Sequence, residues 1–239
     1  MGRPDDLCAT SELDAAVARA SPNDPWTMRV GLSQLLGLAG IVLYNWWVYV
    51  LVATTVLAST DEFFSDLEAT GRPDAALLQH LDLAAGIVMV AAFLLRGPWG
   101  PNGKRREWRW LVVFAVAGAI GGHYSYACPE GLSAACRSAE WHLRLPLHHY
   151  LHVVSGVIEF AMMTTAVYFA WRRTRNDGGW VAHAVTWTGV ALLIGYPLLA
   201  LAYLLDEFGA IVEPIFFVAY SVMVFVELFE PSRKHVTHR

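Results

Sequence analysis

Apolar residues gather in six long stretches that short polar segments separate. A helix that crosses a bilayer needs about 20 mostly apolar residues, because the hydrocarbon core is roughly 30 Å thick and the backbone must hydrogen-bond internally. The pattern therefore predicts an all-α polytopic membrane bundle of six transmembrane helices. The predicted spans run from about Val30 to Leu57, Leu77 to Leu95, Trp110 to His123 (the shortest), Leu147 to Trp171, Trp180 to Leu205 and Ile211 to Phe229.

The composition agrees with this class of protein. Of the 239 residues, 56% are apolar and 16% are charged, whereas soluble domains carry about 25% charged residues. A net charge of −4 and the lack of a long basic tract exclude a nucleic-acid-binding protein. No internal repeat interrupts the pattern, so we expect one six-helix transmembrane domain over residues 30–229, between cytosolic tails over residues 1–29 and 230–239.

The distribution of lysine and arginine predicts the orientation, because cytoplasmic segments of membrane proteins carry an excess of these residues. With the N-terminus inside, fourteen of the seventeen Lys and Arg residues fall in inner segments, and only Arg72, Arg137 and Arg144 fall outside. We therefore expect a multi-pass protein of the cell membrane with both termini in the cytoplasm. Two outer segments, residues 58–76 and 124–146, are long enough to carry a binding function.

Two cysteines, Cys128 and Cys136, lie in the second long outer segment. Because the extracytoplasmic face is oxidising, we expect them to form a disulfide bond that closes a small loop. The alternative is a pair of thiol ligands for a metal, but zinc knuckles typically place such cysteines two residues apart. The eight-residue separation therefore favours the disulfide.

Ionisable residues inside a span are costly in lipid and indicate a candidate site. At 100° per residue, four polar residues of the fourth span share one arc of about 100°, and Gly156 keeps part of that face open. These four are His148, His149, His152 and Glu159, and the outer ends of other spans add His80, Asp82, His123, Asp206, Glu207 and Glu213. In a closed bundle the arc turns inward. We then expect at least two of His80, Asp82, His123, Asp206 and Glu213 to lie within hydrogen-bonding or one-water reach of His149, His152 or Glu159.

Three kinds of site are compatible with this cluster. The first is a metal site for zinc or another transition metal, since His148 and His152 at i, i+4 can reach one ion, with His123 and His149 as further candidate ligands. The second is a hydrogen-bond network that only holds helices together. The third is a haem site, which is typically formed by histidines deep in opposed spans rather than crowded at one end. At the other side of the bundle, Glu227 lies near the end of the last span, where its side chain can reach water.

Several segments together resemble a known family. They are Asp66 to Pro73, Asp82 to Gly86, Cys128-Pro129 with Cys136, and His148 to Gly156. These runs look like the outer loops and spans of the actinobacterial multi-span proteins known as domain of unknown function 998. The resemblance covers residues 35–229 and implies a six-helix bundle without an established activity. The chain departs from the family pattern at His123-Tyr124, where an aromatic–proline pair is usual.

Two classes of function follow from these residues. One is an intramembrane hydrolase, in which a histidine-bound metal activates water against a lipid or lipid-linked bond, with Asp82 or Glu159 as the catalytic base. A fainter likeness, carried by His148 and His152 alone, is to membrane hydrolases related to alkaline ceramidases, which hold zinc with histidines from several helices. The other class is a non-catalytic protein that transports lipids or small molecules or helps to assemble a membrane complex. Membrane lipids are expected partners in the first class, and membrane proteins are additional partners in the second.

Overall fold

The computed structural model describes residues 25–53, 60–97, 105–205 and 207–230. These residues form only helices and connecting segments, with no strand among them, so the predicted all-α class is confirmed. In chain order the helices are α2 (Pro25–Tyr44), α3 (Trp46–Ala53), the 3₁₀ helix η1 (Ser65–Glu68), α4 (Ala75–Arg96), α5 (Glu107–His123), α6 (Ala134–Trp141), α7 (Leu147–Thr174), α8 (Trp180–Leu205) and α9 (Gly209–Phe229).

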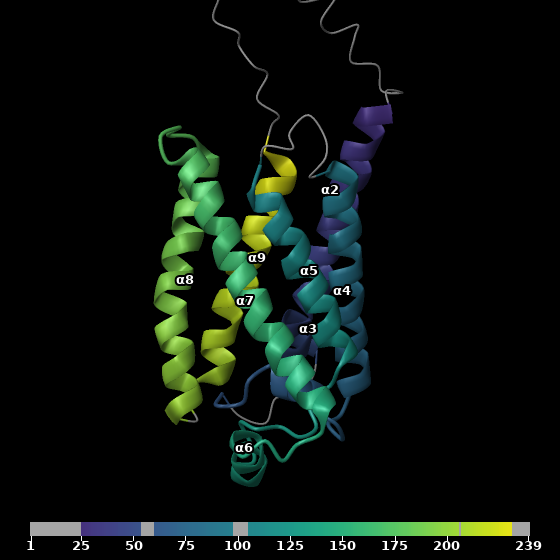
Figure 1. Cartoon of the computed structure of the whole chain (residues 1–239), viewed down its shortest axis with the longest axis vertical. Helices are drawn as coiled ribbons and strands as arrows, with labels where there is room; N and C mark the ends of the chain where they lie inside the picture. The colour runs from purple at the N-terminus through teal and green to yellow at the C-terminus, as the bar shows by residue number, and fades with distance from the viewer. Residues whose placement is uncertain (1–24, 54–59, 98–104, 206, 231–239) are drawn as a thin grey trace, which may run out of the picture.

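Helices α2, α4, α5, α7, α8 and α9 run side by side and alternate in direction along the chain (Figure 1). Their neighbour contacts close a ring in the order α2, α4, α5, α7, α8, α9 and back to α2. Helix α2 begins and helix α9 ends at the same end of the bundle, while α3, η1 and α6 lie at the other (Figure 1). We call the second of these the α6 end.

Five helices of the described chain are long and apolar enough to cross a membrane: α2, α4, α7, α8 and α9. The protein is therefore a membrane-type helical bundle. Helix α5 corresponds to the third predicted span but has only 17 residues, about 26 Å at 1.5 Å per residue. It packs between α4 and α7, and its place as a sixth span remains a prediction.

The first predicted span is divided into α2 and α3 at Asn45. The Asn45 side chain donates a hydrogen bond to the Ile41 carbonyl (2.7 Å) and another to the Ser221 hydroxyl (2.7 Å). The backbone pattern also changes at this point, because the Val48 N–H donates to the carbonyl of Asn45, which is three residues back instead of four. A side chain that hydrogen-bonds to nearby backbone competes with the helical ladder, which explains the break. Residues 54–57 of the predicted span lie outside the described chain.

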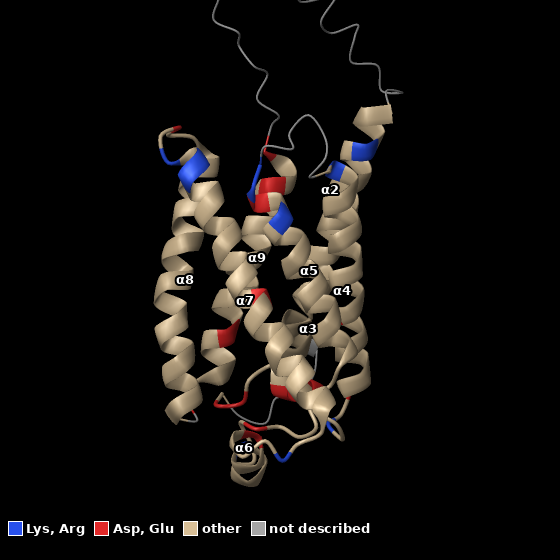
Figure 2. Ribbon diagram, in the orientation of Figure 1, with Lys and Arg blue, Asp and Glu red and all other residues tan. Residues whose placement is uncertain are grey.

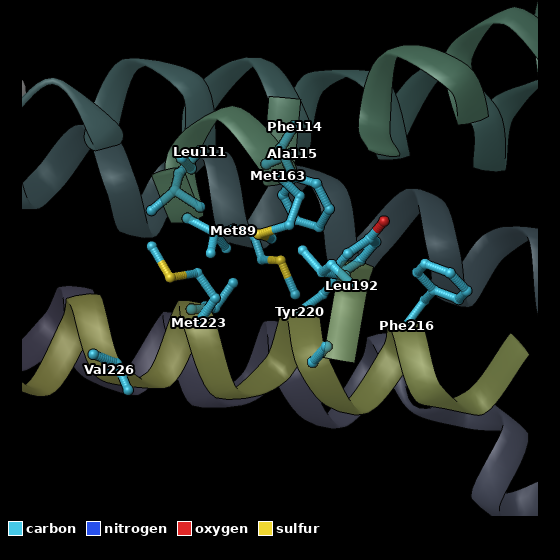
Figure 3. Packing of buried hydrophobic residues seen from close by; sticks show 14 of the residues in the cluster. Met89, Leu111, Phe114, Ala115, Met163, Leu192, Phe216, Tyr220, Met223 and Val226 are labelled. Carbon is cyan, nitrogen blue, oxygen red and sulfur yellow. The ribbon is translucent and has the colours of Figure 1, made fainter. Parts of the chain in front are cut away.

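The interior of the bundle is filled by large apolar and aromatic side chains (Figure 3). Met89, Phe114, Met163, Tyr220 and Met223 come from α4, α5, α7 and α9 and are each at most 2% exposed. The outer surface is also apolar: Leu35, Trp187 and Leu193 are 64–74% exposed. Large exposed apolar surfaces are typical of proteins that contact lipid or partners.

The two ends of the bundle differ in charge (Figure 2). The end opposite α6, which we call the basic end, carries Arg29, Arg96, Arg105, Arg106, Arg109, Arg172, Arg173 and Arg175 at helix ends and in nearby connections. The α6 end carries Arg72, Arg137 and Arg144 together with most of the described acidic residues. Most of the described basic residues thus lie at one end of the bundle, as the predicted orientation requires. The assignment of this end to the cytoplasm remains a prediction.

The predicted disulfide between Cys128 and Cys136 is present, with their Cα atoms 6.0 Å apart. It closes the segment that leads into α6. This segment is tied to the one around η1, because the Gly131 N–H donates to the Asp66 carboxylate (3.1 Å) and the Thr70 N–H donates to the Tyr126 carbonyl (2.9 Å). The two long segments therefore form one cap over the α6 end.

Candidate functional site

A cavity of about 420 Å³ lies inside the α6 end. Its wall combines carboxyl groups with aromatic rings and contains no Lys or Arg among the described residues that line it. The carboxyl groups are Glu68, Asp82, Glu130, Glu159 and Glu213, and the aromatic residues are Tyr44, Trp46, Phe63, Tyr126, Phe160, Tyr196, Tyr203, Phe216 and Phe217. A smaller pocket of about 60 Å³ shares Tyr44, Asp82, His152, Gly156 and Glu159 with it and extends toward α5.

Asp82 is positioned by the close crossing of α4 and α5. A Cβ added at Gly122 would lie 2.8 Å from the backbone carbonyl carbon of Asp82, so a glycine is needed there for the two helices to approach. Small residues allow such close helix packing in membrane proteins. The Asp82 carboxyl then accepts a hydrogen bond from the Trp46 indole N–H at 2.6 Å.

Glu159 projects from the middle of α7 toward α2. The Tyr44 hydroxyl donates a hydrogen bond to its carboxyl group at 3.0 Å. Gly156 lies one turn away on the same face, and a Cβ added there would have no heavy atom within 4 Å. The predicted opening of this face at Gly156 is therefore confirmed, and it lies in the cavity wall.

Glu68 reaches the cavity from η1. Its side chain is 1% exposed and lies next to the Asp82 carboxyl group. Burial, and then the neighbouring Asp82, raise the pKa of Glu68 well above its usual value. The Oε2 atom of Glu68 has no hydrogen-bond partner among the described residues.

Glu213, at the start of α9, holds η1 in place. Its carboxylate accepts hydrogen bonds from the backbone N–H groups of Phe64 (2.5 Å) and Ser65 (3.3 Å). These donors belong to the first turn of the short helix, where N–H groups have no partner within the helix itself. Glu213, which was expected at the outer end of the last span, therefore both lines the cavity and hydrogen-bonds to the cap.

A second pair of acids, Glu130 and Glu140, lies at the edge of the cavity. The Tyr203 hydroxyl lies 3.2 Å from Glu130 and 3.3 Å from Glu140. Burial and the hydrogen bond with Glu140 raise the pKa of Glu130. Burial would also raise the pKa of Glu140, but hydrogen bonds from Glu130 and His149 outweigh it and lower this pKa. Glu130 is therefore the more readily protonated acid of the two.

The predicted metal-ligand histidines occupy separate environments. The Ala127 N–H donates to Nδ1 of His149, and Nε2 of His149 lies 3.0 Å from Glu140. Nε2 therefore carries the proton, and both ring nitrogens are engaged. His152 lines the cavity, with Nδ1 donating to the carbonyls of Gly121 (3.0 Å) and Tyr124 (2.7 Å). His123 is exposed in a shallow pocket between α4 and α5, and His148 is half-buried outside the cavity.

The structure brings two of the expected neighbours of the fourth span into the cavity, while their hydrogen-bonding or one-water reach to His149, His152 or Glu159 remains a prediction. Asp82 and Glu213 line the same cavity as His152 and Glu159. His80 is instead exposed and bonds to the carbonyl of Ala76, four residues back. Asp206 lies outside the described chain. Groups of three or more His, Cys, Asp and Glu side chains that could hold a metal do not occur among the described residues.

The cavity opens sideways between α7 and α8. Near the basic end these helices are close, and a Cβ on Gly189 would lie 3.6 Å from Val167. Toward the α6 end α7 leans away from α8 (Figure 1). The residues that line the cavity there include Val157, which is 64% exposed, and the exposed Ala200. The cavity therefore reaches the apolar outer surface of the bundle.

The site residues that the sequence analysis missed come mainly from the cap. Glu68 and Glu130 lie in polar segments between spans, where acids are usually solvated. The sequence did contain an indication of this burial, because Phe63, Phe64 and Leu67 are interspersed with acids in the segment around η1. Such apolar residues indicate that a connecting segment is buried.

These features define a class: a polytopic, membrane-type helical protein with a carboxyl- and aromatic-lined cavity. Residues 36–229 match the family described as a protein of unknown function, DUF998, and the chain belongs to this family. The resemblance inferred from the cysteine and histidine segments is thereby confirmed. No curated protein and no solved structure matches the chain.

Proposed function

We propose that this protein binds an amphipathic, lipid-like molecule in the cavity at the α6 end and acts as a binding or transport protein. The observation that carries the proposal is the sideways opening between α7 and α8 at Val157 and Ala200. An amphiphile can pass from the bilayer into the cavity through this opening without its apolar chain entering water. The volume of about 420 Å³ falls within the roughly 300–1,000 Å³ of small-molecule sites.

The chemistry of the wall supports an amphiphile rather than a wholly apolar guest. Phe160, Tyr196 and Phe216 surround the part of the cavity near the opening with aromatic surface. The carboxyl groups of Glu68, Asp82 and Glu159 lie deeper, toward α2 and α4. A molecule with an apolar body and a polar head satisfies both regions, because buried polar groups require polar partners.

Photolabelling of the purified full-length protein in phosphatidylcholine nanodiscs tests this proposal. The probe is an alkyl alcohol that carries a diazirine on its chain, and labelled peptides are identified by mass spectrometry. We expect labels on α7 and α8 residues that line the cavity. Val157→Trp should place an indole across the opening and reduce this labelling several-fold.

Val154→Trp is the matched control, because Val154 is an exposed valine of the same helix that does not line the cavity. It should leave the labelling unchanged. Equal labelling of the cavity peptides in both variants and in the wild type, or labels confined to the outer surface, would contradict the proposal.

The metal-dependent hydrolase remains a separate prediction from the sequence, with His148, His152 and His123 as ligands and Asp82 or Glu159 as base. Elemental analysis of the purified protein tests it. A stoichiometric transition metal that is lost in a His148→Ala/His152→Ala double variant would support the hydrolase. Metal-free protein that still binds the amphiphile would support the binding function instead.

A further inference from the structure

We propose that the cavity receives the positively charged head of an amphiphile, a primary ammonium group, in exchange for a proton from the neighbouring acids Glu68 and Asp82 of its wall. This inference rests on the proposed function and adds the chemical class of the ligand. It is carried by three features of the wall: uncompensated acids, a group of aromatic rings beside them, and a buried oxygen atom that lacks a donor.

The acidic character of the wall disfavours an anionic head. Five carboxyl groups come from five different parts of the chain, namely η1, α4, the segment before α6, α7 and α9. The described lining residues supply no Lys or Arg to balance them. A phosphate or carboxylate head placed here would lose its water without gaining a cationic partner, which is unfavourable in a buried site. An ammonium group has the complementary charge.

Aromatic rings lie next to these acids. The ring centroids of Tyr44 and Phe217 are 5.2 Å apart, and those of Trp46 and Phe217 are 6.5 Å apart. All three line the cavity, and Trp46 and Tyr44 are hydrogen-bonded to Asp82 and Glu159 respectively. The faces of aromatic rings attract cations, most strongly where water is excluded. The acids and the rings therefore favour the same kind of guest.

The Oε2 atom of Glu68 supplies the third observation. It is buried, it belongs to a residue of the cavity wall, and it lacks a hydrogen-bond partner among the described residues. Leaving such an acceptor unsatisfied is costly. A primary ammonium group carries three N–H donors, so it can satisfy this oxygen, whereas an alcohol can donate only one hydrogen bond and brings no charge.

The exchange with a proton follows from the groups that face the Glu68–Asp82 pair. The titratable groups that line the cavity with this pair are Tyr44 from α2, His152 and Glu159 from α7, Tyr196 and Tyr203 from α8, Glu213 from α9, and Tyr126 and Glu130 from the cap. Without a cation, the burial and proximity of the two acids favour one proton on the pair. A bound ammonium group favours the doubly ionised pair, and the released proton passes to water. By linkage, the affinity then rises with pH by up to tenfold per pH unit for each proton released.

The test uses three diazirine probes with the same alkyl chain and an ammonium, an alcohol or a carboxylate head. The ammonium head stays charged below about pH 9, so its own ionisation does not vary between pH 6 and pH 8. In wild-type protein we expect the ammonium probe to label the cavity at least tenfold more strongly than the carboxylate probe. Its labelling should increase from pH 6 to pH 8, while labelling by the alcohol should not.

Glu68→Gln should lower ammonium labelling several-fold relative to labelling by the alcohol and remove its pH dependence. Glu207→Gln is the matched control, because Glu207 is an exposed acid at the same end that does not line the cavity. If Glu68→Gln does not fold, Glu159→Gln replaces it, since glutamine still accepts the Tyr44 hydrogen bond. That variant should weaken ammonium labelling.

The outcomes separate this inference from the proposed function. Equal cavity labelling by the alcohol and the ammonium probe, or ammonium labelling that does not change with pH or with Glu68→Gln, would overturn the inference and leave the binding function standing. Stronger labelling by the carboxylate probe would also overturn it. If no probe labels the cavity, the proposed function itself fails.

Discussion

Individual buried acidic residues toward the α6 end accept hydrogen bonds from backbone N–H groups, a tyrosine hydroxyl or a tryptophan indole. Glu213 accepts from two backbone N–H groups, Glu159 from the Tyr44 hydroxyl, and Asp82 from the Trp46 indole. Asp66, which is 1% exposed, accepts from the Gly131 N–H and so joins the two segments of the cap. Burying each acid costs desolvation free energy, and the hydrogen bond offsets part of this cost. The net free energy therefore depends on whether the acid is ionised.

Asp66 provides a prediction for pH dependence. Burial raises its pKa to about 6, although the Gly131 N–H opposes this shift. The pKa of Asp66 is higher in the folded state than in the unfolded state. Its stabilising contribution to the free energy of unfolding is therefore full below about pH 4 and is lost as the pH rises through about 6. The loss amounts to about 2–3 kcal/mol at most. Asp66→Asn cannot ionise and still offers an acceptor to Gly131.

Thermal unfolding in detergent at pH 5 and pH 7.5 measures this effect. The wild type should lose more stability over this interval than Asp66→Asn, whose melting temperature should change less. An identical pH dependence in the two proteins would show that Asp66 does not titrate as described. Asp74→Asn, at an exposed position of the same segment, should behave as the wild type does.

Helical periodicity explains which residues of the site could be predicted. The 100° step along α7 placed His152 and Glu159 on one inward face, and both line the cavity. Their neighbours could not be read in this way, because the partner of His149 is Glu140, which belongs to α6 in the cap. Contacts between a span and a connecting segment depend on how the segment folds back, and hydropathy contains no such information.

At the scale of helices, the basic end is held by an ion-pair network that hydropathy also failed to indicate. Arg173 of α7 donates hydrogen bonds to Glu107 of α5 (2.5 Å), Glu227 of α9 (2.7 Å) and Glu230 (2.6 Å). Arg105 adds a contact to Glu230 at 3.0 Å. The expectation that Glu227 reaches water was wrong, because its side chain is 0% exposed. One arginine therefore connects three helices that are far apart in the sequence.

Removal of Arg173 should destabilise the bundle strongly. Arg173→Met leaves buried Glu107 and Glu227 without their main cationic partner, and breaking a buried ion pair from one side typically costs about 3–5 kcal/mol. Arg172→Met changes the exposed neighbouring arginine and should cost little. Thermal unfolding of the two variants in detergent makes the comparison. Equal stability of Arg173→Met and the wild type would mean that the network does not hold the basic end together.

For the molecule as a whole, the hydrophobic pattern predicted the order of the long helices, since each stretch corresponds to α2–α3, α4, α5, α7, α8 or α9, and five of these helices are long and apolar enough to cross a membrane. It could not predict the break at Asn45, where the side chain bonds both to the Ile41 carbonyl of its own helix and to Ser221 of α9, which is far away in the sequence. Nor could it predict the cavity, because the divergence of α7 from α8 is a property of packing. Periodicity within one helix determines its buried face, not its distance from a neighbour.

The orientation of the whole bundle is tested by accessibility. In a Cys8→Ser background, a cysteine at Pro73 lies at the α6 end and one at Asn176 lies at the basic end, and both positions are exposed. Because basic segments stay in the cytoplasm, we expect a membrane-impermeant maleimide to label Pro73→Cys but not Asn176→Cys in intact cells. The reverse pattern would place the basic end outside.

The central claim is that an amphiphile occupies the cavity between α7 and α8. The most direct measurement is a crystal structure in a lipid phase with an alkyl ammonium compound that carries bromine on its chain. We predict an anomalous peak near the opening among Phe160, Tyr196 and Phe216, and density for the ammonium group beside Glu68 and Asp82. Bromine peaks found only on the outer apolar surface, with water alone in the cavity, would contradict the account.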